Sequence, residues 1–297
     1  MHLLWMVLGT LVFASMAVCV KFASSHFNAA ELVFYRGIVS MVLLGILARR
    51  QHVDLRTRHP FMHAWRSLVG VGSMGAWFYA IGALPIATAT TLNYMSSIWV
   101  GLFVVLSSLL QRSSNPLPAS PRQGLLQAAL IVTILTGFAG VVLMLRPSLD
   151  SSQSLVAALV GVFSGMGAAL AYMQVVGLAR IGEPETRVVF YFAVGSTVAG
   201  GLLMPVAGIS TLLHPASLWL LPMGLLASLG QLCMTHAYST AASPRNTLVV
   251  ASLQYSGIVF AGLYGLLLFD DSLPLLGWLG MALIIASGVV ATLLRAR

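Results

Sequence analysis

Long apolar runs, separated by short polar or Pro- and Gly-containing gaps, fill nearly the whole chain. Each run has about 20 residues, the length that an α-helix needs to cross the hydrocarbon core of a bilayer. The pattern therefore predicts an all-α integral membrane protein with ten transmembrane helices, and Pro85 alone separates the third from the fourth. We expect the helices at residues 3–22, 29–48, 66–84, 87–109, 124–145, 154–176, 187–206, 217–238, 246–269 and 274–294.

The first apolar run, 3–20, also has the length of a secretory signal peptide. It lacks a positively charged start and a small-x-small cleavage site, and Val18 before Cys19 does not suit lipoprotein cleavage. We therefore expect this run to be retained as the first helix.

Composition favours the same class. Of the 297 residues, 59% are hydrophobic and 7% are charged, with a mean hydropathy of +0.94, whereas a soluble domain carries roughly 25% charged residues. The formal net charge is +8, but the basic residues lie between the apolar runs, so we expect no nucleic-acid partner. Cys19 and Cys233 fall inside predicted spans and offer neither a disulfide framework nor metal-ligand spacing.

Arginine placement predicts the orientation, because cytoplasmic loops are rich in Lys and Arg. With the N-terminus inside, only Lys21 and Arg146 fall on the outer side, and Arg36 lies within a span. The inner side then holds Arg49, Arg50, Arg56, Arg58, Arg66, Arg112, Arg122, Arg180, Arg187, Arg245, Arg295 and Arg297. We therefore expect both termini and the 49–63 loop in the cytoplasm, and the region of Asp270 outside.

Similar sequence segments recur in the two halves of the chain. Thr-Leu-Asn-Tyr at 91–94 resembles Ser-Leu-Gln-Tyr at 252–255, and Tyr79 precedes Pro85 by the same interval at which Tyr238 precedes Pro244. We expect two five-helix repeats, 1–147 and 148–297, and the odd number of helices makes the second repeat inverted. Inverted repeats are typical of secondary transporters, whose substrate sites lie between the halves.

The segments 79–89, 266–271 and 277–290 resemble the drug/metabolite transporter superfamily with paired EamA domains. The chain departs from the family where Tyr94 and Tyr255 are followed by Met and Ser instead of a common Pro, and where Asp270 replaces a common Glu. The variant at 254–257 is similar to the amino-acid exporter branch, the YddG-like proteins. The resemblance implies export of amino acids, including aromatic and other neutral ones, across the bacterial inner membrane by alternating access. A carrier for another small metabolite or a lipophilic drug is the alternative.

Enzyme chemistry is not indicated. No Ser/His/Asp set, glycine-rich phosphate loop or ATP-binding motif appears, so we expect no enzyme, no cofactor, no metal and no ATP-driven transport by this chain alone. The histidines lie almost wholly in predicted loops; only His236 falls in a span, without a nearby acid in the sequence. A packing role is the simpler interpretation of His236.

Two charged residues mark the second span. A charge inside a bilayer is costly and therefore a functional hypothesis by default. We favour a structural interpretation for Arg36, as a group that binds backbone carbonyls or pairs across helices, and place Glu31 and Lys21 at the outer interface. A direct role in transport stays open.

Uncharged polar and aromatic residues form the candidate substrate site. Asn93, Tyr94 and Ser97 share one stripe of the fourth span, and the ninth repeats it. The predicted site consists of Tyr79, Asn93, Tyr94, Ser97, Phe163, Gln231, Tyr238, Gln254 and Tyr255. With little charge, such a cavity suits an amino-acid zwitterion.

Close helix packing is the alternative, which we expect for 161–165. A receptor or scaffold is less favoured, because the stripe recurs in both halves. The expected partners are a small-molecule substrate and the lipid bilayer, and the oligomeric state stays open.

Overall fold

The computed structural model describes residues 2–96, 98–99, short pieces between 128 and 143, 152–240, 253–270 and 274–295. Every regular element in these ranges is a helix, which confirms the predicted all-helical class. The helices are α1 (His2–Ala23), α2 (Ala29–Arg50), α3 (Pro60–Ala83), α4 (Ile86–Tyr94), α7 (Ser152–Arg180), α8 (Glu185–Ala207), η2 (Pro215–Trp219), α9 (Leu220–Ser239), α11 (Ser256–Leu268) and α12 (Leu275–Arg295). The predicted span 124–145 and the first part of 246–269 lie largely outside the described residues, so the count of ten stays a prediction.

Proline sets two of the helix boundaries. Pro85 separates α3 from α4, and Leu84 before it is extended, with φ −121° and ψ 165°. α3 begins at Pro60 rather than at residue 66, because proline at a first helical position has its φ already set and needs no hydrogen-bond partner. The earlier start makes α3 a helix of 24 residues and places Arg66 inside it.

Five stretches of the described chain are long and apolar enough to cross a membrane: Leu4–Ala23, Ala29–Arg50, Leu155–Arg180, Glu185–Ala207 and Pro215–Ser239. Their length and composition agree with an integral membrane protein.

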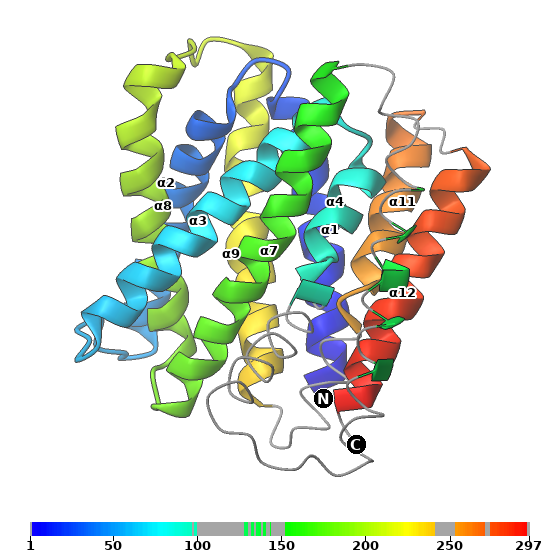
Figure 1. Ribbon diagram of the computed structural model, residues 1–297. Helices are drawn as coiled ribbons and strands as arrows, with labels where there is room; N and C mark the ends of the chain where they lie inside the picture. Colours follow the sequence, from blue (N-terminus) through cyan, green and yellow to red (C-terminus); the bar gives the residue numbers. More distant parts are fainter. Residues whose placement is uncertain are drawn as a thin grey trace.

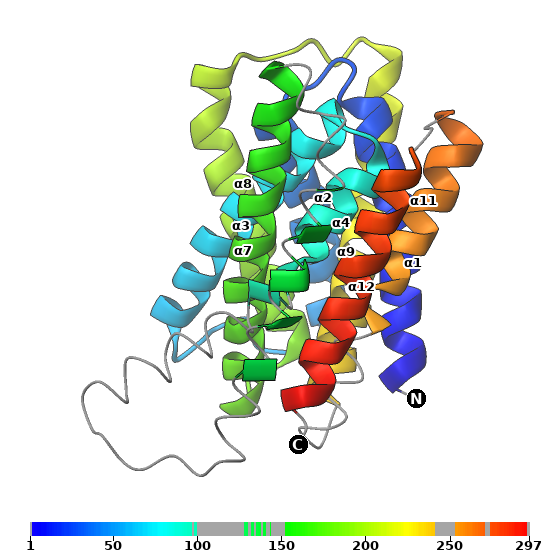
Figure 2. The ribbon, with the colours of Figure 1, turned by 45° about the vertical axis from the view of Figure 1, so that its right-hand side comes forward.

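The helices form one bundle in which segments distant in sequence lie side by side (Figures 1 and 2). α2 packs along α8, α3 along α7 and α1 along α9. α4 lies between α7 and α11. The buried hydrophobic core runs through α1, α3, α4 and α9, and includes Phe27, Phe78, Met16 and Leu92.

The ends of the bundle are distinguished by their connections. The start of α1, the end of α12 and the α2–α3 connection lie at one end (Figure 1). The α1–α2 turn and the α8–α9 connection lie at the opposite end. This arrangement puts both termini on the same side of the bundle.

Candidate functional site

A cavity of about 70 Å³ lies in the middle of the bundle. Seven helices line it: α1, α2, α3, α4, α7, α8 and α9. The lining consists of Phe13, Met16, Arg36, Arg66, Gly70, Ser73, Met74, Trp77, Asn93, Tyr94, Ala168, Ala171, Tyr172, Phe192, Gln231 and Met234. Ligand pockets usually have about 300–1,000 Å³, so a small solute enters only if the helices separate. The structure therefore corresponds to a contracted state of the cavity.

A second hollow, of about 810 Å³, follows α2, α3 and α8. It is almost entirely apolar, and its edge includes Leu68, Leu202 and Leu203, which are 69%, 73% and 57% exposed. An apolar face of this kind suits lipid chains. We therefore place the functional site in the central cavity.

The contact between α4 and α7 positions the polar stripe of α4. A Cβ at Gly165 would lie 2.5 Å from the carbonyl oxygen of Leu92, so only glycine permits this approach. Asn93 Nδ2 donates to Ser164 Oγ at 3.1 Å, and Ser73 Oγ donates to the Ser164 carbonyl at 2.7 Å. The close packing expected for 161–165 is confirmed, and it brings Asn93 to the cavity wall.

A hydrogen-bonded chain connects the predicted ninth span to the cavity. Tyr238 donates its hydroxyl to Gln254 Oε1 at 3.4 Å, and Gln254 Nε2 donates to the Tyr172 hydroxyl at 2.9 Å. Tyr172 lines the cavity, whereas Gln254 lies one hydrogen bond behind it and Tyr238 lies two. Tyr255 is 4% exposed and belongs to the core. Tyr172 was not among the predicted site residues, because it has no matching residue in the stripes.

The structure thus brings together only part of the predicted site. Asn93, Tyr94 and Gln231 line the cavity. Tyr79 and Phe163 do not, because their side chains point away from the core and are 42% and 61% exposed. Ser97 lies outside the described residues.

Two arginines in the cavity wall correct the expectation of an uncharged site. Arg36 of α2 and Arg66 of α3 are each 3% exposed. Arg66 was expected in a cytoplasmic loop, but α3 starts early enough to bury it. Both guanidinium groups face the ring of Phe192, at 5.2 Å for Arg36 and 4.5 Å for Arg66. Arg36 reaches Ser196 Oγ at 3.5 Å, and within the described chain no carbonyl accepts from it.

Glu31 links α2 to the α8–α9 connection at one end of the bundle. It forms a capping box with Asn28 at the start of α2, and its carboxylate accepts from the amide and the hydroxyl of Ser210 in the α8–α9 connection. Glu31 is fully buried within the bundle, so its carboxylate does not reach solvent from the outer interface as expected. Lys21 donates to the Leu84 carbonyl at 2.6 Å instead of extending towards solvent. Glu31 therefore links the start of α2 to the α8–α9 connection.

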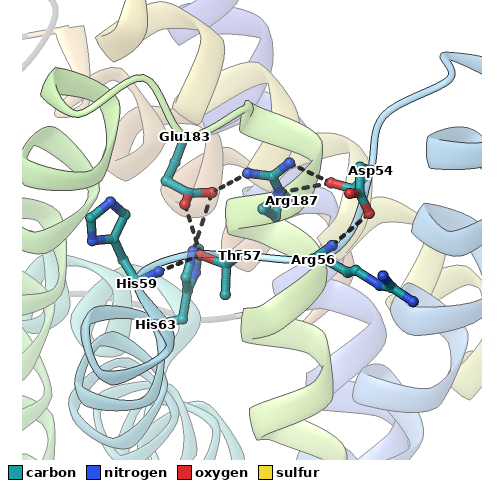
Figure 3. A network of polar contacts seen from close by, with 7 residues as sticks. All are labelled: Asp54, Arg56, Thr57, His59, His63, Glu183 and Arg187. Atoms are coloured by element: carbon teal, nitrogen blue, oxygen red, sulfur yellow. Dashed lines mark hydrogen bonds and ion pairs between the residues drawn. The ribbon is translucent and has the colours of Figure 1, made fainter.

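At the opposite end of the bundle, Glu183 links the α7–α8 turn to the α2–α3 connection (Figure 3). It accepts from Thr57 Oγ1 at 2.7 Å and from Arg187 Nη1 at 2.8 Å, and His63 Nε2 lies 3.5 Å away. Arg187 also donates through Nε to the Asp54 carbonyl at 2.8 Å. Burial alone would raise the pKa of Glu183, but the hydrogen bonds from Thr57 and Arg187 and the positive charge of Arg187 hold that pKa below its ordinary value.

His236 has an acidic neighbour that the sequence did not reveal. Its Nδ1 lies 3.1 Å from a carboxylate oxygen of Glu185, which also accepts from Ser239. Glu185 is distant in sequence and belongs to the start of α8. Within the described residues, no group of three or more His, Cys, Asp or Glu side chains is arranged to hold a metal ion.

Comparison with known proteins places these features in a family. A family model described as the EamA-like transporter family matches residues 1–108. An uncharacterized transporter of Helicobacter pylori (strain J99) is 31% identical over 96% of this chain and 92% of its own. The pseudopaline exporter CntI of Pseudomonas aeruginosa (strain UCBPP-PA14) is 31% identical over 94% of this chain and 92% of its own.

Two further similarities are partial or structural. An S-adenosylmethionine uptake transporter of Rickettsia bellii is 26% identical over 48% of this chain and 45% of its own. A protein of known crystal structure has a TM-score of 0.66 and 16% identity, over 100% of this chain and 98% of that chain. The latter shows a shared fold.

Apolar helices of membrane-spanning length around a buried polar cavity, with transporters as relatives, define a multi-pass membrane transporter and not an enzyme. The chain belongs to the EamA-like transporter family, within the drug/metabolite transporter superfamily.

Proposed function

We propose that this transporter exports an amino acid or an amino-acid derivative across the bacterial cytoplasmic membrane by alternating access. The observation that carries the proposal is the central cavity, where amide and phenol groups of Asn93, Tyr94, Tyr172 and Gln231 meet apolar walls. A few placed polar groups among apolar side chains are typical of a small-molecule site. One relative is named an exporter, which favours the outward direction.

Two inverted five-helix halves, 1–147 and 148–297, are part of the proposal. Under this arrangement α1 corresponds to α7, and α3 corresponds to α9. The packing of α1 on α9 is then the counterpart of the packing of α7 on α3, and the α2–α8 pair is its own counterpart. This reciprocity supports the inverted repeat, an architecture in which one half rocks against the other around the site.

The two ends of the bundle supply contacts that alternating access has to break. Glu31 of the first half binds Ser210 of the second at one end. Glu183 of the second half binds Thr57 of the first at the other end. Both contacts are formed together here, so each end of the bundle holds a link between the proposed halves. Opening towards either side requires the loss of one contact and the retention of the other.

The orientation is proposed from charge. Arginines of the α2–α3 connection lie at the same end of the bundle as the start of α1 and the end of α12 (Figure 1). We assign that end to the cytoplasm. Cys19 and Cys233 are buried, so the parent gives little background in single-cysteine labelling. Labelling of Arg56→Cys from outside in intact cells would overturn this orientation.

Counterflow in proteoliposomes tests the function. Vesicles preloaded with one unlabelled amino acid should take up the same labelled compound, across a panel of neutral, aromatic and acidic amino acids. Asn93→Ala and Gln231→Ala each remove a hydrogen-bond partner worth about 1–3 kcal/mol, so apparent affinity should fall about tenfold. Tyr79→Ala, on the exposed face, is the matched control. If no amino acid shows counterflow, the proposed substrate class is wrong.

A further inference from the structure

The most buried charges of the central cavity are two like charges, and the described residues provide no counter-ion for them. Arg36 and Arg66 come from neighbouring helices, α2 and α3, and both line the cavity. In the part of the chain that the structure describes, Arg36 Nε and Arg66 Nε and Nη1 have no hydrogen-bond partner. The shared neighbour is Phe192, whose ring face attracts cations but carries no net charge.

The acidic residues that the structure describes form no ion pair with the cavity arginines. The chain has only seven, and Asp150 and Asp271 lie outside the described residues. Within the described ranges, Glu31 binds Asn28 and Ser210, and no ion pair joins an acid to either cavity arginine. None of the acidic residues that the structure describes belongs to the cavity lining. The cavity thus holds two positive charges that the described protein does not neutralise.

An arrangement of this kind costs stability, and inside a membrane protein it indicates a functional site. A buried charge without a partner is strongly destabilising, and charged residues within a membrane protein face partners or a substrate pathway. The guanidinium group presents a planar fork of N–H donors that matches a carboxylate with two parallel hydrogen bonds. An anion in the cavity would therefore satisfy the unpaired nitrogens and the charge together.

We propose that Arg36 and Arg66 form a carboxylate-binding site, and that the transported solute is an anionic amino-carboxylate with at least two carboxylates. This inference rests on the proposed function and narrows its substrate class. A neutral amino-acid zwitterion leaves both positive charges uncompensated, whereas each additional carboxylate removes one. Asn93 and Gln231 offer amide oxygens to the ammonium group, and Met74, Trp77 and Met234 offer apolar surface to the remaining body. Cationic drugs are disfavoured by the same charges.

Equilibrium binding to the purified protein tests the inference. We would displace labelled L-glutamate with unlabelled L-glutamate, L-glutamine, glutarate and inorganic phosphate at constant ionic strength. L-Glutamine is the matched probe, because it differs from L-glutamate by one carboxylate. We expect L-glutamate to bind at least tenfold more tightly than L-glutamine, and glutarate to compete. Displacement by inorganic phosphate as strong as by glutarate would overturn the assignment to carboxylates.

Variants locate the site. Arg36→Gln and Arg66→Gln should each weaken L-glutamate binding at least tenfold and abolish the preference over L-glutamine. Arg36→Lys and Arg66→Lys keep the charge without the fork and should restore part of the affinity. Arg187→Gln is the control, because this arginine already has Glu183 as its partner at the end of the bundle. It should keep the preference for L-glutamate.

A second measurement applies if the glutamine variants do not fold. Phenylglyoxal modifies arginine side chains, and L-glutamate should protect Arg36 and Arg66 of the parent protein where L-glutamine does not. Unprotected modification of both residues overturns the inference.

The outcomes separate the inference from the proposed function. Equal binding of L-glutamine and L-glutamate, with counterflow of neutral amino acids, overturns the carboxylate site and leaves amino-acid transport standing. Binding of glutarate through both arginines, without counterflow of any amino acid, supports the carboxylate site and overturns the proposed function.

Discussion

Arginines occur in two contrasting environments within this bundle. At the α7–α8 end, Arg187 lies 2.8 Å from Glu183 and donates to the Asp54 carbonyl (Figure 3). In the central cavity, Arg36 and Arg66 have the ring of Phe192 beside them and no acid in the described chain. Arginine therefore forms an ion pair at the α7–α8 end, whereas the described part of the central cavity provides no acid for Arg36 and Arg66.

The stability of the fold alone would favour an acidic partner beside the more deeply buried arginines. The Arg187 side chain retains 16% exposure, so water already screens it in part. Arg36 and Arg66 retain 3%, and the need for a counter-charge is therefore greater in the cavity. Within the described chain, no acid lies beside the cavity arginines, although they need a counter-charge more than Arg187 does. This difference indicates that Arg187 serves the fold and that the cavity pair serves a ligand.

Removing the aromatic neighbour of the cavity pair should have the largest effect. Phe192 is 7% exposed and lies against both guanidinium groups. Phe192→Ala should lower the free energy of unfolding by about 3–5 kcal/mol, because a buried phenylalanine leaves a cavity behind. Phe190→Ala, on the same helix but only partly buried, is the control and should cost less. Equal losses in thermal unfolding would mean that the position beside the arginines has no special weight.

Breaking the paired region should destabilise it to a lesser extent. Glu183→Gln removes the ion pair with Arg187 and weakens the bond from Thr57. Hydrogen bonds to charged groups contribute about 1.5–3 kcal/mol, and we expect a loss of that size. In a double-mutant cycle, Arg187→Gln should cost much less in the Glu183→Gln background than in the parent. Simple additivity of the two losses contradicts the cross-link.

The paired region should also respond to acid. The pKa of Glu183 is held below its ordinary value of 4.5, and the unfolded chain lacks the partners that hold it there. Stabilisation by Glu183 is therefore fully present above about pH 4.5 and is lost as the pH falls through the lowered folded pKa. The difference in melting temperature between the parent and Glu183→Gln should narrow as the pH falls below about 4.5. A constant difference across this range contradicts the assignment.

Substitutions on the outer face should have the smallest effect. Tyr79→Ala and Phe163→Ala remove exposed side chains and should change the free energy of unfolding by no more than about 0.5 kcal/mol. Neither should change the preference among amino acids in counterflow. A change in preference among amino acids in either variant would place these residues on the transport path.

The sequence predicted the helices well because the length of an apolar run reports directly on membrane spans. Its main error was the start of α3, where His63 and Arg66 made the first turns look like a loop. Those residues are buried by contacts with distant helices, and run length contains no information about such contacts. Pro60 was the local signal that was overlooked.

The site was only partly predictable. Asn93 and Gln231 stood out because polar groups on membrane helices have to face protein or water. Repeat correspondence suggested Tyr79 and Phe163, but it fixes a position along a helix and not the direction of the side chain. Tyr172 and Phe192 gave no signal, since aromatic residues are common on apolar helices. Their roles emerge only from the packing of α7 and α8 around the arginines.

The most direct test of the central claim is the melting temperature of Arg66→Gln beside the parent, without ligand and with saturating L-glutamate. If Arg66 is held unpaired for a carboxylate, the empty variant should be more stable than the parent by about 0.5–2 kcal/mol, a rise of a few degrees. L-Glutamate should then raise the melting temperature of the parent by more than that of the variant. An empty variant that melts below the parent, with the same L-glutamate shift as the parent, would contradict the account.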